Sequence, residues 1–247
     1  IRLSLVGSEM CIRDRYADWQ SWRFPTTANP LIDPAEIEAQ RDLLPEHLFR
    51  QEYLAEFLQD AGGVFRNVEA VATVEPESEP QPGAQIVFGV DWGRSNDYTA
   101  IAVLDVETGR LLALDRFNLI GWELQRGRLA TLAAQWRPDA IWAEANSIGG
   151  PNIEALQTEG LPVIAFQTTA RSKGPLIEAL ALAIERGDIA LLRDPVLIEE
   201  LHAYSLERLP SGGFRYSAPP GGHDDTVIAV ALAWHGATQG RAGISFV

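Results

Sequence analysis

The sequence QIVFGVDWGRSNDYTAIA, residues 85–102, decides both the expected fold and the expected site. It begins with the apolar run Ile86–Val90, which has the length and composition of a buried strand. Asp91 ends this run, a polar turn with Gly93 comes next, and a second strand is expected from Thr99. A carboxylate at the end of a buried strand is costly unless a partner such as a metal ion neutralises it. Asp91 is therefore the first candidate functional residue.

The composition limits the classes to which the chain can belong. It has 247 residues, 46% of them hydrophobic, which allows one large domain or one domain with an appendage. No apolar run approaches the roughly 20 residues that span a bilayer, so no membrane partner is expected. The net charge of −14 argues against broad, non-specific binding to nucleic acid but leaves room for a local basic groove. Cys11 is the single cysteine, which excludes an intrachain disulfide.

The N-terminal part of the chain divides into three expected segments. Residues 1–15 fit poorly with the rest of the chain and resemble a translated adapter, so we expect a non-native leader and a native chain that begins near Tyr16 and is truncated upstream. Two short helices are expected next, over residues 34–43 and from Pro45 to just before Gly62. Residues 69–84 are rich in proline and acidic residues, which predicts a solvated linker or an extended surface segment at a domain boundary.

Residues 85–240 have the pattern of one α/β domain, in which three strands precede an alternation of helices and strands. The expected strands are 86–90, 99–106, 110–118, 139–145 and 162–166, and the expected helices are 122–136, 152–159, 174–186, 195–205 and 223–235. A short extended piece at 189–192 and a hairpin around 211–213 are also expected. In the helix 122–136, Leu124 and Leu129 are expected on the inner side. This order predicts a mixed five-stranded sheet flanked by helices and preceded by two short ones.

Four carboxylates are expected to meet at one edge of this sheet. Asp91 and Glu144 end the first and fourth strands, so a parallel pairing of these strands places both at the same edge. Asp224 and Asp225 begin the last helix, whose apolar run Val227–Trp234 predicts tight packing against the sheet. Taken singly, each carboxylate has an ordinary explanation as a turn former, an exposed strand end or a helix cap.

Such a cluster is expected to persist at neutral pH because divalent cations occupy it. Oxygen ligands without cysteine and with little histidine favour Mg²⁺ or Mn²⁺ over Zn²⁺. Two ions roughly 4 Å apart can activate a water and stabilise the leaving oxygen of a phosphodiester. We therefore expect Asp91, Glu144, Asp224 and Asp225 to bind two ions and to catalyse phosphodiester hydrolysis. His223 is left open between a ligand, a general base and, as the first choice for a lone histidine, a packed residue.

Basic side chains near this edge are the expected contacts to a nucleic-acid backbone. Arg94 comes shortly after Asp91, and Arg171 and Lys173 lie where a helix N-terminus would also suit a phosphate. Arg215 flanks the expected hairpin and would extend the same groove. The alternative is that these residues belong to ordinary exposed loops.

The most specific motifs of the chain are FRQEYLAEF at 49–57, GVDWG at 89–93 and GHDDT at 222–226. Together they resemble the large terminase subunit of tailed bacteriophages and prophages, specifically its C-terminal nuclease domain. The resemblance covers about residues 22–237. It implies an RNase H-like fold, with metal ligands at Asp91, at Glu144 and at Asp224 or Asp225. It also implies endonucleolytic cutting of concatemeric viral DNA during genome packaging.

The same resemblance implies partners and a location. A nuclease of this family is expected to act on double-stranded DNA with an ATPase domain, a small terminase subunit and the portal protein, in the cytoplasm of the bacterial host. Residues 16–68 resemble the end of that ATPase domain, but no GxxxxGK[ST] phosphate loop precedes Trp22. The chain alone is therefore not expected to hydrolyse ATP or to translocate DNA.

Three other hypotheses stay open from the sequence. A Holliday-junction resolvase of the same fold would share the carboxylates, but it should be a compact dimer without the N-terminal helices. A sugar- or acetate-kinase-like ATPase also begins with a strand and Asp-x-Gly, as in residues 91–93, but it needs a second lobe for which the chain is too short. An inactive prophage remnant would act only as an interaction module.

Overall fold

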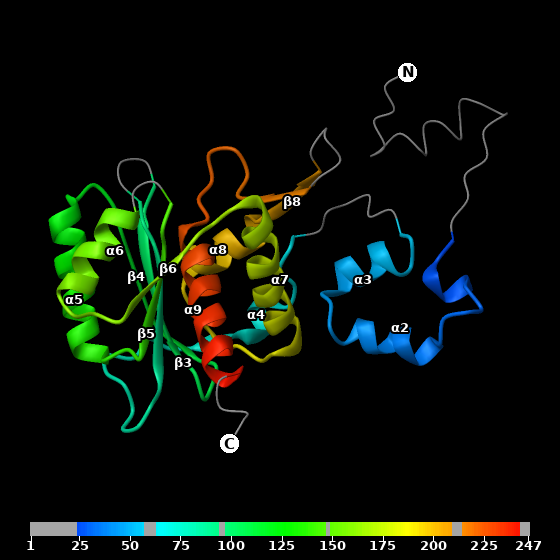
Figure 1. Ribbon diagram of the computed structural model, residues 1–247, viewed down its shortest axis with the longest axis horizontal. Helices are drawn as coiled ribbons and strands as arrows, with labels where there is room; N and C mark the ends of the chain where they lie inside the picture. Colours follow the sequence, from blue (N-terminus) through cyan, green and yellow to red (C-terminus); the bar gives the residue numbers. More distant parts are fainter. Residues whose placement is uncertain (1–23, 57–62, 94–96, 147–148, 209–213, 243–247) are drawn as a thin grey trace.

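A mixed five-stranded sheet with helices on both faces is the centre of the protein in the computed structural model (Figure 1). The structure describes residues 24–56, 63–93, 97–146, 149–208 and 214–242. The strand order is β4-β3-β2-β5-β6, with β2 Ile86–Asp91, β3 Thr99–Asp105, β4 Leu111–Phe117, β5 Ala140–Glu144 and β6 Val163–Phe166. The expected α/β class with a mixed five-stranded sheet is therefore confirmed.

The first three strands form an antiparallel meander. Asp91 at the end of β2 pairs with Ala100 on β3, which in turn pairs with Arg116 on β4. These three residues form one row across the sheet. Since residues in one row share a face of the sheet, the Arg116 side chain lies on the same face as that of Asp91, with only the methyl group of Ala100 between them.

The parallel pairing of β2 with β5 sets the position of the two strand-end carboxylates. Val90 lies beside Ala143 in this register. Asp91 and Glu144 are the next residues along their strands, so they end the strands side by side at one edge of the sheet. The predicted pairing of the first and fourth strands is confirmed.

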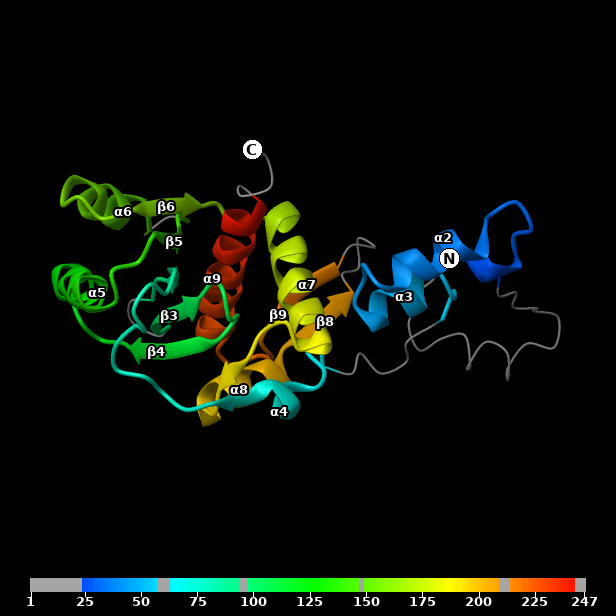
Figure 2. The same ribbon diagram turned by 90° about the horizontal axis from the view of Figure 1, so that it is seen from below.

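Alternation along β2 divides the core into two layers. The side chains of Ile86, Phe88 and Val90 pack on one face with α5 Trp122–Trp136 and α6 Gly149–Thr158. Val87 belongs to the core on the opposite face, which α7 Ala170–Arg186 and α9 Asp225–Ala242 cover (Figure 2). Because strand side chains alternate with a period of two, Asp91 points to the α9 face.

The helix predictions hold for existence and order but differ in detail. Helix α5 has the predicted bounds, α7 begins four residues earlier than expected, and α9 continues to Ala242. Helix α8, Pro195–Ala203, packs against α9. The expectation for Leu124 was wrong, because its side chain is 66% exposed while Gln125 is fully buried. The Gln125 side chain points inward because its amide donates hydrogen bonds to the backbone carbonyl oxygens of Gly93 and Ile120.

Helix α9 packs directly onto the backbone of β2 at Gly89. A Cβ atom at Gly89 would lie 1.9 Å from the carbonyl oxygen of Ala229 and 2.4 Å from the backbone nitrogen of Ala233. The two alanines are fully buried one helical turn apart, so the helix offers only small side chains where it crosses the strand. This close approach brings the first turn of α9, with Asp225, next to the end of β2.

The N-terminal residues form the two expected short helices, α2 Pro34–Arg41 and α3 Glu46–Glu52, after a 3-10 turn at Thr26–Ala28. The Asp33 side chain caps α2 by accepting a hydrogen bond from the Ala35 amide at 2.9 Å. Helix α3 ends at Glu52, far before the expected end near Gly62, and residues 57–62 lie outside the described part of the chain. The Glu46 amide donates to Glu185 on α7 at 3.0 Å, which joins α3 to the central domain.

The first residues of the expected linker 69–84 are folded, which corrects the prediction of a solvated segment there. Helix α4, Val68–Val71, leads into β1, Ala72–Val74, which pairs in parallel with β7, Leu191–Leu192. Val68, Val71 and Val74 are buried in the core of the α9 face. Their spacing of three was concealed in the sequence by the neighbouring acidic residues and prolines. Residues 75–84 form neither helix nor strand.

The expected hairpin is present as β8 Ser205–Arg208 and β9 Phe214–Ser217, which pair antiparallel; residues 209–213 between them lie outside the described chain. Within the described residues, no helix combines the length and the apolar character that crossing a membrane requires.

Replacing Gly89 by alanine tests the close approach of α9 to β2. Because the new methyl group would overlap backbone atoms of α9, Gly89→Ala should lower the free energy of unfolding by about 3 kcal/mol or more in a urea titration. Gly127→Ala is the matched control, because no atom lies within 4 Å of a Cβ there and alanine favours the α5 helix by about 1 kcal/mol. Equal stability of Gly89→Ala and the unchanged protein would contradict this packing.

Candidate metal centre

Asp91 and Glu144 form a pair of carboxyl groups at the edge of the sheet. Burial raises the pKa of Asp91 well above its ordinary value, and the neighbouring Glu144 raises it further by charge repulsion and through a hydrogen bond between the two groups. Asp225 and Asp224 add smaller contributions in the same direction. A buried carboxyl group among like charges ionises at low cost only if a cation compensates the new charge.

Two short contacts fix the position of Glu144. The Asn146 side-chain amide donates to Glu144 Oε1 at 3.0 Å and to the Thr168 carbonyl at 3.0 Å. Gly149, the first residue of α6, lies so close that a Cβ there would be 1.8 Å from the Glu144 carbonyl oxygen. The end of β5 is therefore held between α6 and the segment that precedes α7.

Asp225 is the buried member of the acidic pair that begins α9, with 5% of its surface exposed. Burial and the charge of Glu200 raise the pKa of Asp225 to about 6, against the opposing effects of a backbone hydrogen bond from Tyr98 and of the charges on Arg116 and His223. Its Oδ2 lies 3.6 Å from Arg116 Nη2 and 3.6 Å from His223 Nδ1. This oxygen has no hydrogen-bond partner among the described residues.

Asp224 faces the opposite side of the site, toward α7 and Tyr204. Lys173 Nζ donates to Asp224 Oδ2 at 3.1 Å. The Tyr204 hydroxyl is fully buried and makes no hydrogen bond within the described residues. Its pKa is raised by burial first, then by the charge of Asp224 and a loose contact with that carboxylate, and then by the charge of Asp91. A buried hydroxyl beside two carboxylates is a position that also fits the water shell of a hydrated cation.

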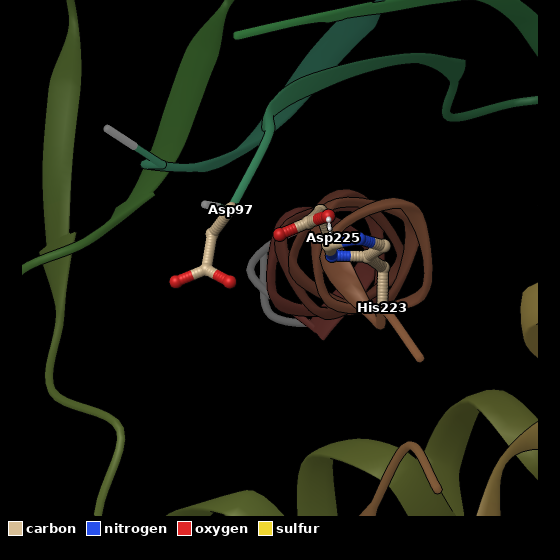
Figure 3. A group of neighbouring side chains, drawn as sticks. All are labelled: Asp97, His223 and Asp225. Atoms are coloured by element: carbon tan, nitrogen blue, oxygen red, sulfur yellow. Dashed lines mark ion pairs between the residues drawn. The ribbon is translucent and has the colours of Figure 1, made fainter. Parts of the chain in front are cut away.

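Asp97, His223 and Asp225 form a second group of possible ligands, which shares Asp225 with the four-carboxylate cluster. One ligand atom from each lies within 4.8 Å of the others (Figure 3). The His223 ring also contacts the Tyr98 ring edge to face, with 5.1 Å between the ring centroids. The role of His223 stayed open from the sequence and Asp97 was not predicted, although an acidic residue in the polar turn after Asp91 was a signal that could have found it.

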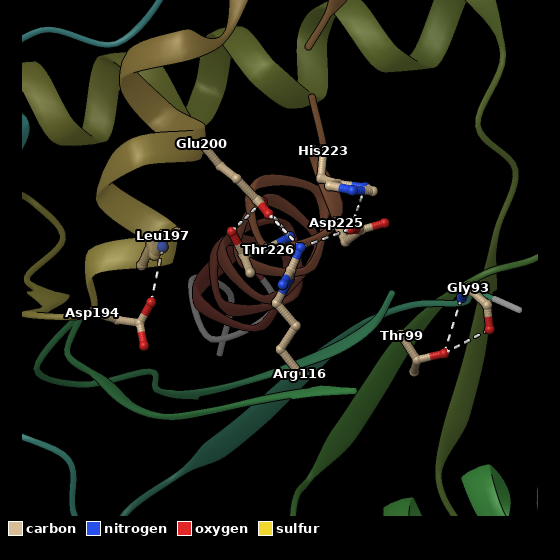
Figure 4. A network of polar contacts seen from close by, with 9 residues as sticks. All are labelled: Gly93, Thr99, Arg116, Asp194, Leu197, Glu200, His223, Asp225 and Thr226. Carbon is tan, nitrogen blue, oxygen red and sulfur yellow. Dashed lines mark hydrogen bonds and ion pairs between the residues drawn. The ribbon is translucent and has the colours of Figure 1, made fainter. Parts of the chain in front are cut away.

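A buried polar network anchors the turn after Asp91. The Gly93 amide donates to the Thr99 hydroxyl at 3.0 Å, a contact drawn in Figure 4. The Gln125 side-chain amide donates to the carbonyl oxygens of Gly93 at 3.0 Å and Ile120 at 3.1 Å. Since the network ties the turn to α5, the end of β2 is fixed from the face opposite α9.

Two further charged residues, one buried and one partly buried, lie next to Asp225, and neither was predicted from the sequence. Arg116 comes from β4, in the same row as Asp91, and Glu200 comes from α8, with 6% of its surface exposed. Glu200 shares one face of α8 with the buried Leu197 and Leu201, so an acid within an apolar stripe was the available signal. The contact between β4 and α8 could not be read from the sequence.

The predicted DNA contacts have different surroundings. Arg171 and Arg215 are exposed, whereas Lys173 is paired with Asp224. Arg94 lies outside the described residues. A cavity of about 730 Å³ adjoins the start of α7, and its lining consists of Lys173, Ser205, Arg215, Tyr216, Ser217, Ala218, Pro219 and Pro220. This cavity places two basic side chains close to the Asp224 side of the acidic cluster.

A comparison with protein families decides the relationship of this domain. The model of the "Terminase RNaseH-like domain" family matches residues 88–235. The chain belongs to this terminase family. Membership confirms the RNase H-like fold, and it favours the terminase hypothesis over the kinase-like and resolvase hypotheses.

Two curated relatives are the large terminase subunits of Thermus virus P23-45 and Thermus phage G20c. Each is 30% identical over 216 residues, a match that includes 84% of this chain and 44% of the relative. The chain thus spans less than half the length of these relatives.

Solved terminase structures have the same fold. The crystal structure of the large terminase nuclease from thermophilic phage G20c has a TM-score of 0.66 at 28% identity, covering 70% of this chain and 98% of that one. The same nuclease with bound magnesium has a TM-score of 0.67 at 28% identity, covering 71% and 98%. The large terminase of another thermophilic bacteriophage, at 12% identity and a TM-score of 0.65, covers 85% of this chain and 53% of that one and supports the fold alone.

The pKa of Asp91 gives a prediction for stability in metal-free buffer. Because the folded-state pKa is raised above the unfolded one, ionisation of Asp91 destabilises the fold as the pH rises from about 4 through the folded-state value. Asp91→Asn removes this charge, so its stability relative to the unchanged protein should increase by up to about 1.4 kcal/mol per pH unit across that window. Urea unfolding in EDTA between about pH 5 and about pH 8 measures this increase.

Asp188→Asn is the control for this experiment, because Asp188 is exposed beyond the far end of α7. Its stability difference should stay constant over the same pH range. A constant difference for Asp91→Asn as well would show that Asp91 is not held in a repulsive cluster.

Proposed function

We propose that this chain is the nuclease part of a large terminase subunit and cuts concatemeric viral DNA during genome packaging. The observation that carries the proposal is the meeting of Asp91, Glu144, Asp224 and Asp225 from β2, β5 and α9 in a terminase-family domain. Three separate elements supply these acids, and the pKa values of Asp91 and Asp225 are raised by burial and by the charges of neighbouring carboxylates. Perturbed carboxylates in one such group are typical of functional sites.

A divalent cation fits the four carboxylates, because they offer only oxygen ligands. In addition, Asp225 Oδ2 and the neighbouring Tyr204 hydroxyl have no hydrogen-bond partner within the geometric limits among the described residues. Asp91, Glu144, Asp224 and Asp225 would hold Mg²⁺ or Mn²⁺, as two ions. When bound, such ions supply a water of lowered pKa and stabilise the leaving oxygen of the phosphodiester. Nuclease structures from phage G20c with bound magnesium, cobalt and zinc support a divalent cation without favouring one metal.

The residues of the chain itself contribute orientation and proton release. Asn146 holds Glu144 in place, and the network around Gln125 fixes the turn after Asp91. Asp91, whose pKa is raised, would lose its proton when the site is loaded, so loading should become easier as the pH rises. His223, at 3.6 Å from Asp225, would act as an outer ligand or a base for the attacking water.

The proposed substrate is double-stranded DNA, whose backbone would contact a local basic surface. Arg171 and Arg215 are exposed near the cavity that adjoins the site, and Lys173 lines that cavity. Because the whole chain carries a net charge of −14, these few cations would position the backbone rather than bind it tightly. The rest of the affinity for DNA would come from the ATPase domain, the small terminase subunit and the portal protein, in the bacterial cytoplasm.

The proposed division of the chain agrees with this role. Residues 16–68 would be the end of the ATPase domain and its connecting helices, residues 69–84 the connection, and residues 85–240 the nuclease. Residues 1–15 would be a non-native leader. The folding of α4 and β1 onto the nuclease core suggests that the connection is shorter than residues 69–84.

Plasmid cleavage with Mg²⁺ or Mn²⁺ tests the proposed activity. Asp91→Asn and Glu144→Gln should each lower the cutting rate by at least about 100-fold, because each removes a charged ligand from the cluster. EDTA should stop cutting by the unchanged chain. Asp188→Asn should cut at the normal rate, and circular dichroism should show that all variants are folded. Normal cutting by both site variants would rule out the proposed roles.

The salt dependence of DNA binding tests the basic surface. Each phosphate contact that is lost should reduce the slope of log K against log salt by about 0.9, so Arg171→Ala and Arg215→Ala should each show a shallower slope. Fluorescence anisotropy with a labelled duplex, in EDTA to prevent cutting, measures this slope. Arg186→Ala, exposed at the other end of α7, is the control and should leave the slope unchanged. Unchanged slopes for all three variants would place the DNA elsewhere.

A further inference from the structure

A group of largely buried charged side chains lies next to Asp225 and joins three elements of the fold (Figure 4). Arg116 from β4 points between Glu200 from α8 and Asp225 from α9. The same nitrogen, Arg116 Nη2, lies 3.3 Å from Glu200 Oε1 and 3.6 Å from Asp225 Oδ2. One guanidinium is therefore shared by two buried carboxylates, and it lies nearer to Glu200.

The second oxygen of Glu200 is fixed at the start of α9. Glu200 Oε2 accepts a hydrogen bond from the Thr226 amide at 2.9 Å and another from the Thr226 hydroxyl. Thr226 comes directly after Asp225, so Glu200 is tied to the backbone that carries the candidate ligand. With one oxygen on α9 and the other facing Arg116, Glu200 cannot move without releasing one of these contacts.

Arg116 is held in place from the other side by an aromatic ring. Its guanidinium carbon lies 3.4 Å from the centroid of the Tyr98 ring. Its Nε has no hydrogen-bond partner among the described residues, so the guanidinium is not saturated where it stands. Neither Glu200 Oε1 nor Asp225 Oδ2 has a hydrogen-bond partner among the described residues, so the Tyr98 ring and the nearer charge of Glu200 hold this guanidinium beside Asp225.

The position of the Arg116 guanidinium affects how well a metal ion can bind Asp225. A guanidinium that closed on Asp225 would compete with a divalent ion for the carboxylate. Without a guanidinium, Glu200 and Asp225 would be two buried carboxylates with no common counter-charge. The observed geometry lies between these extremes, because Glu200 takes the nearer place at Arg116 Nη2.

We propose that Glu200 is a positioning residue of the metal centre, which draws Arg116 away from Asp225 and so leaves the Asp225 carboxylate available to a divalent cation. This inference rests on the proposed function, because it requires a cation at the cluster. It assigns Glu200 and Arg116 a role in tuning affinity for that cation, not in binding it. A simple helix cap would explain the contacts to Thr226 but not the placement of Arg116.

Calorimetric titration of the full chain with Mn²⁺ tests the proposal through binding alone. Glu200→Gln keeps an oxygen for the Thr226 bonds but loses the charge that holds Arg116. Arg116 should then close on Asp225 and weaken Mn²⁺ binding about tenfold. Arg116→Gln removes the competitor, so it should bind Mn²⁺ as tightly as the unchanged chain or more tightly. The double variant Glu200→Gln/Arg116→Gln should recover the affinity that Glu200→Gln alone loses.

Glu199→Gln is the matched control, because Glu199 is the exposed neighbour of Glu200 on α8, and its Mn²⁺ affinity should not change. Normal affinity in Glu200→Gln, or no recovery in the double variant, would overturn the positioning role. If Glu200→Gln does not fold, a tenfold loss of affinity in Arg116→Gln alone would overturn it as well. Absence of Mn²⁺ binding by the unchanged chain would instead refute the metal centre, and the positioning role with it.

Discussion

The contact between α9 and the bare backbone of β2 is the constraint on which the rest of the site depends. At Gly89 the helix and strand approach so closely that no side chain fits between them. The helix runs along β2 from the Asp91 end, and its first turn therefore lies over the sheet edge where β2 and β5 finish. A helix packed one side chain further away would carry Asp224 and Asp225 out of reach of Asp91.

The charges at this edge are a consequence of that geometry. The fold brings like charges together in a largely buried place, and this arrangement raises the pKa of Asp91 and of Asp225. Only part of the repulsion is compensated inside the protein, by Lys173 at Asp224 and by Arg116 at Asp225. Such a cluster stabilises the protein poorly without a cation, which is consistent with a site selected for binding and chemistry rather than for folding.

The sequence predicted the order of strands and helices along the chain and the acids at the strand ends, because strand length and helix start signals are local. The parallel pairing of β2 with β5 was also expected, whereas the place of β6 in the sheet was not predicted. It did not predict Arg116 and Glu200 as neighbours of Asp225, since their meeting depends on the register of β4 and on the placement of α8. Leu124 was misplaced because the polar network of Gln125 overrides the apolar period of α5. The folded residues 68–74 were missed because three buried valines lie among acidic residues and prolines. Whether each acid is a ligand stays a prediction.

A crystal structure of the full chain soaked with Mn²⁺ and recorded with anomalous scattering would test the central claim most directly. Anomalous density is expected between Asp91, Glu144 and the acids at the start of α9, with carboxylate oxygens at about 2.2 Å from the ion. Density confined to Asp97 and His223, with the Asp91 and Glu144 carboxyl groups still in contact with each other, would contradict a cation site shared by the two strands and the helix.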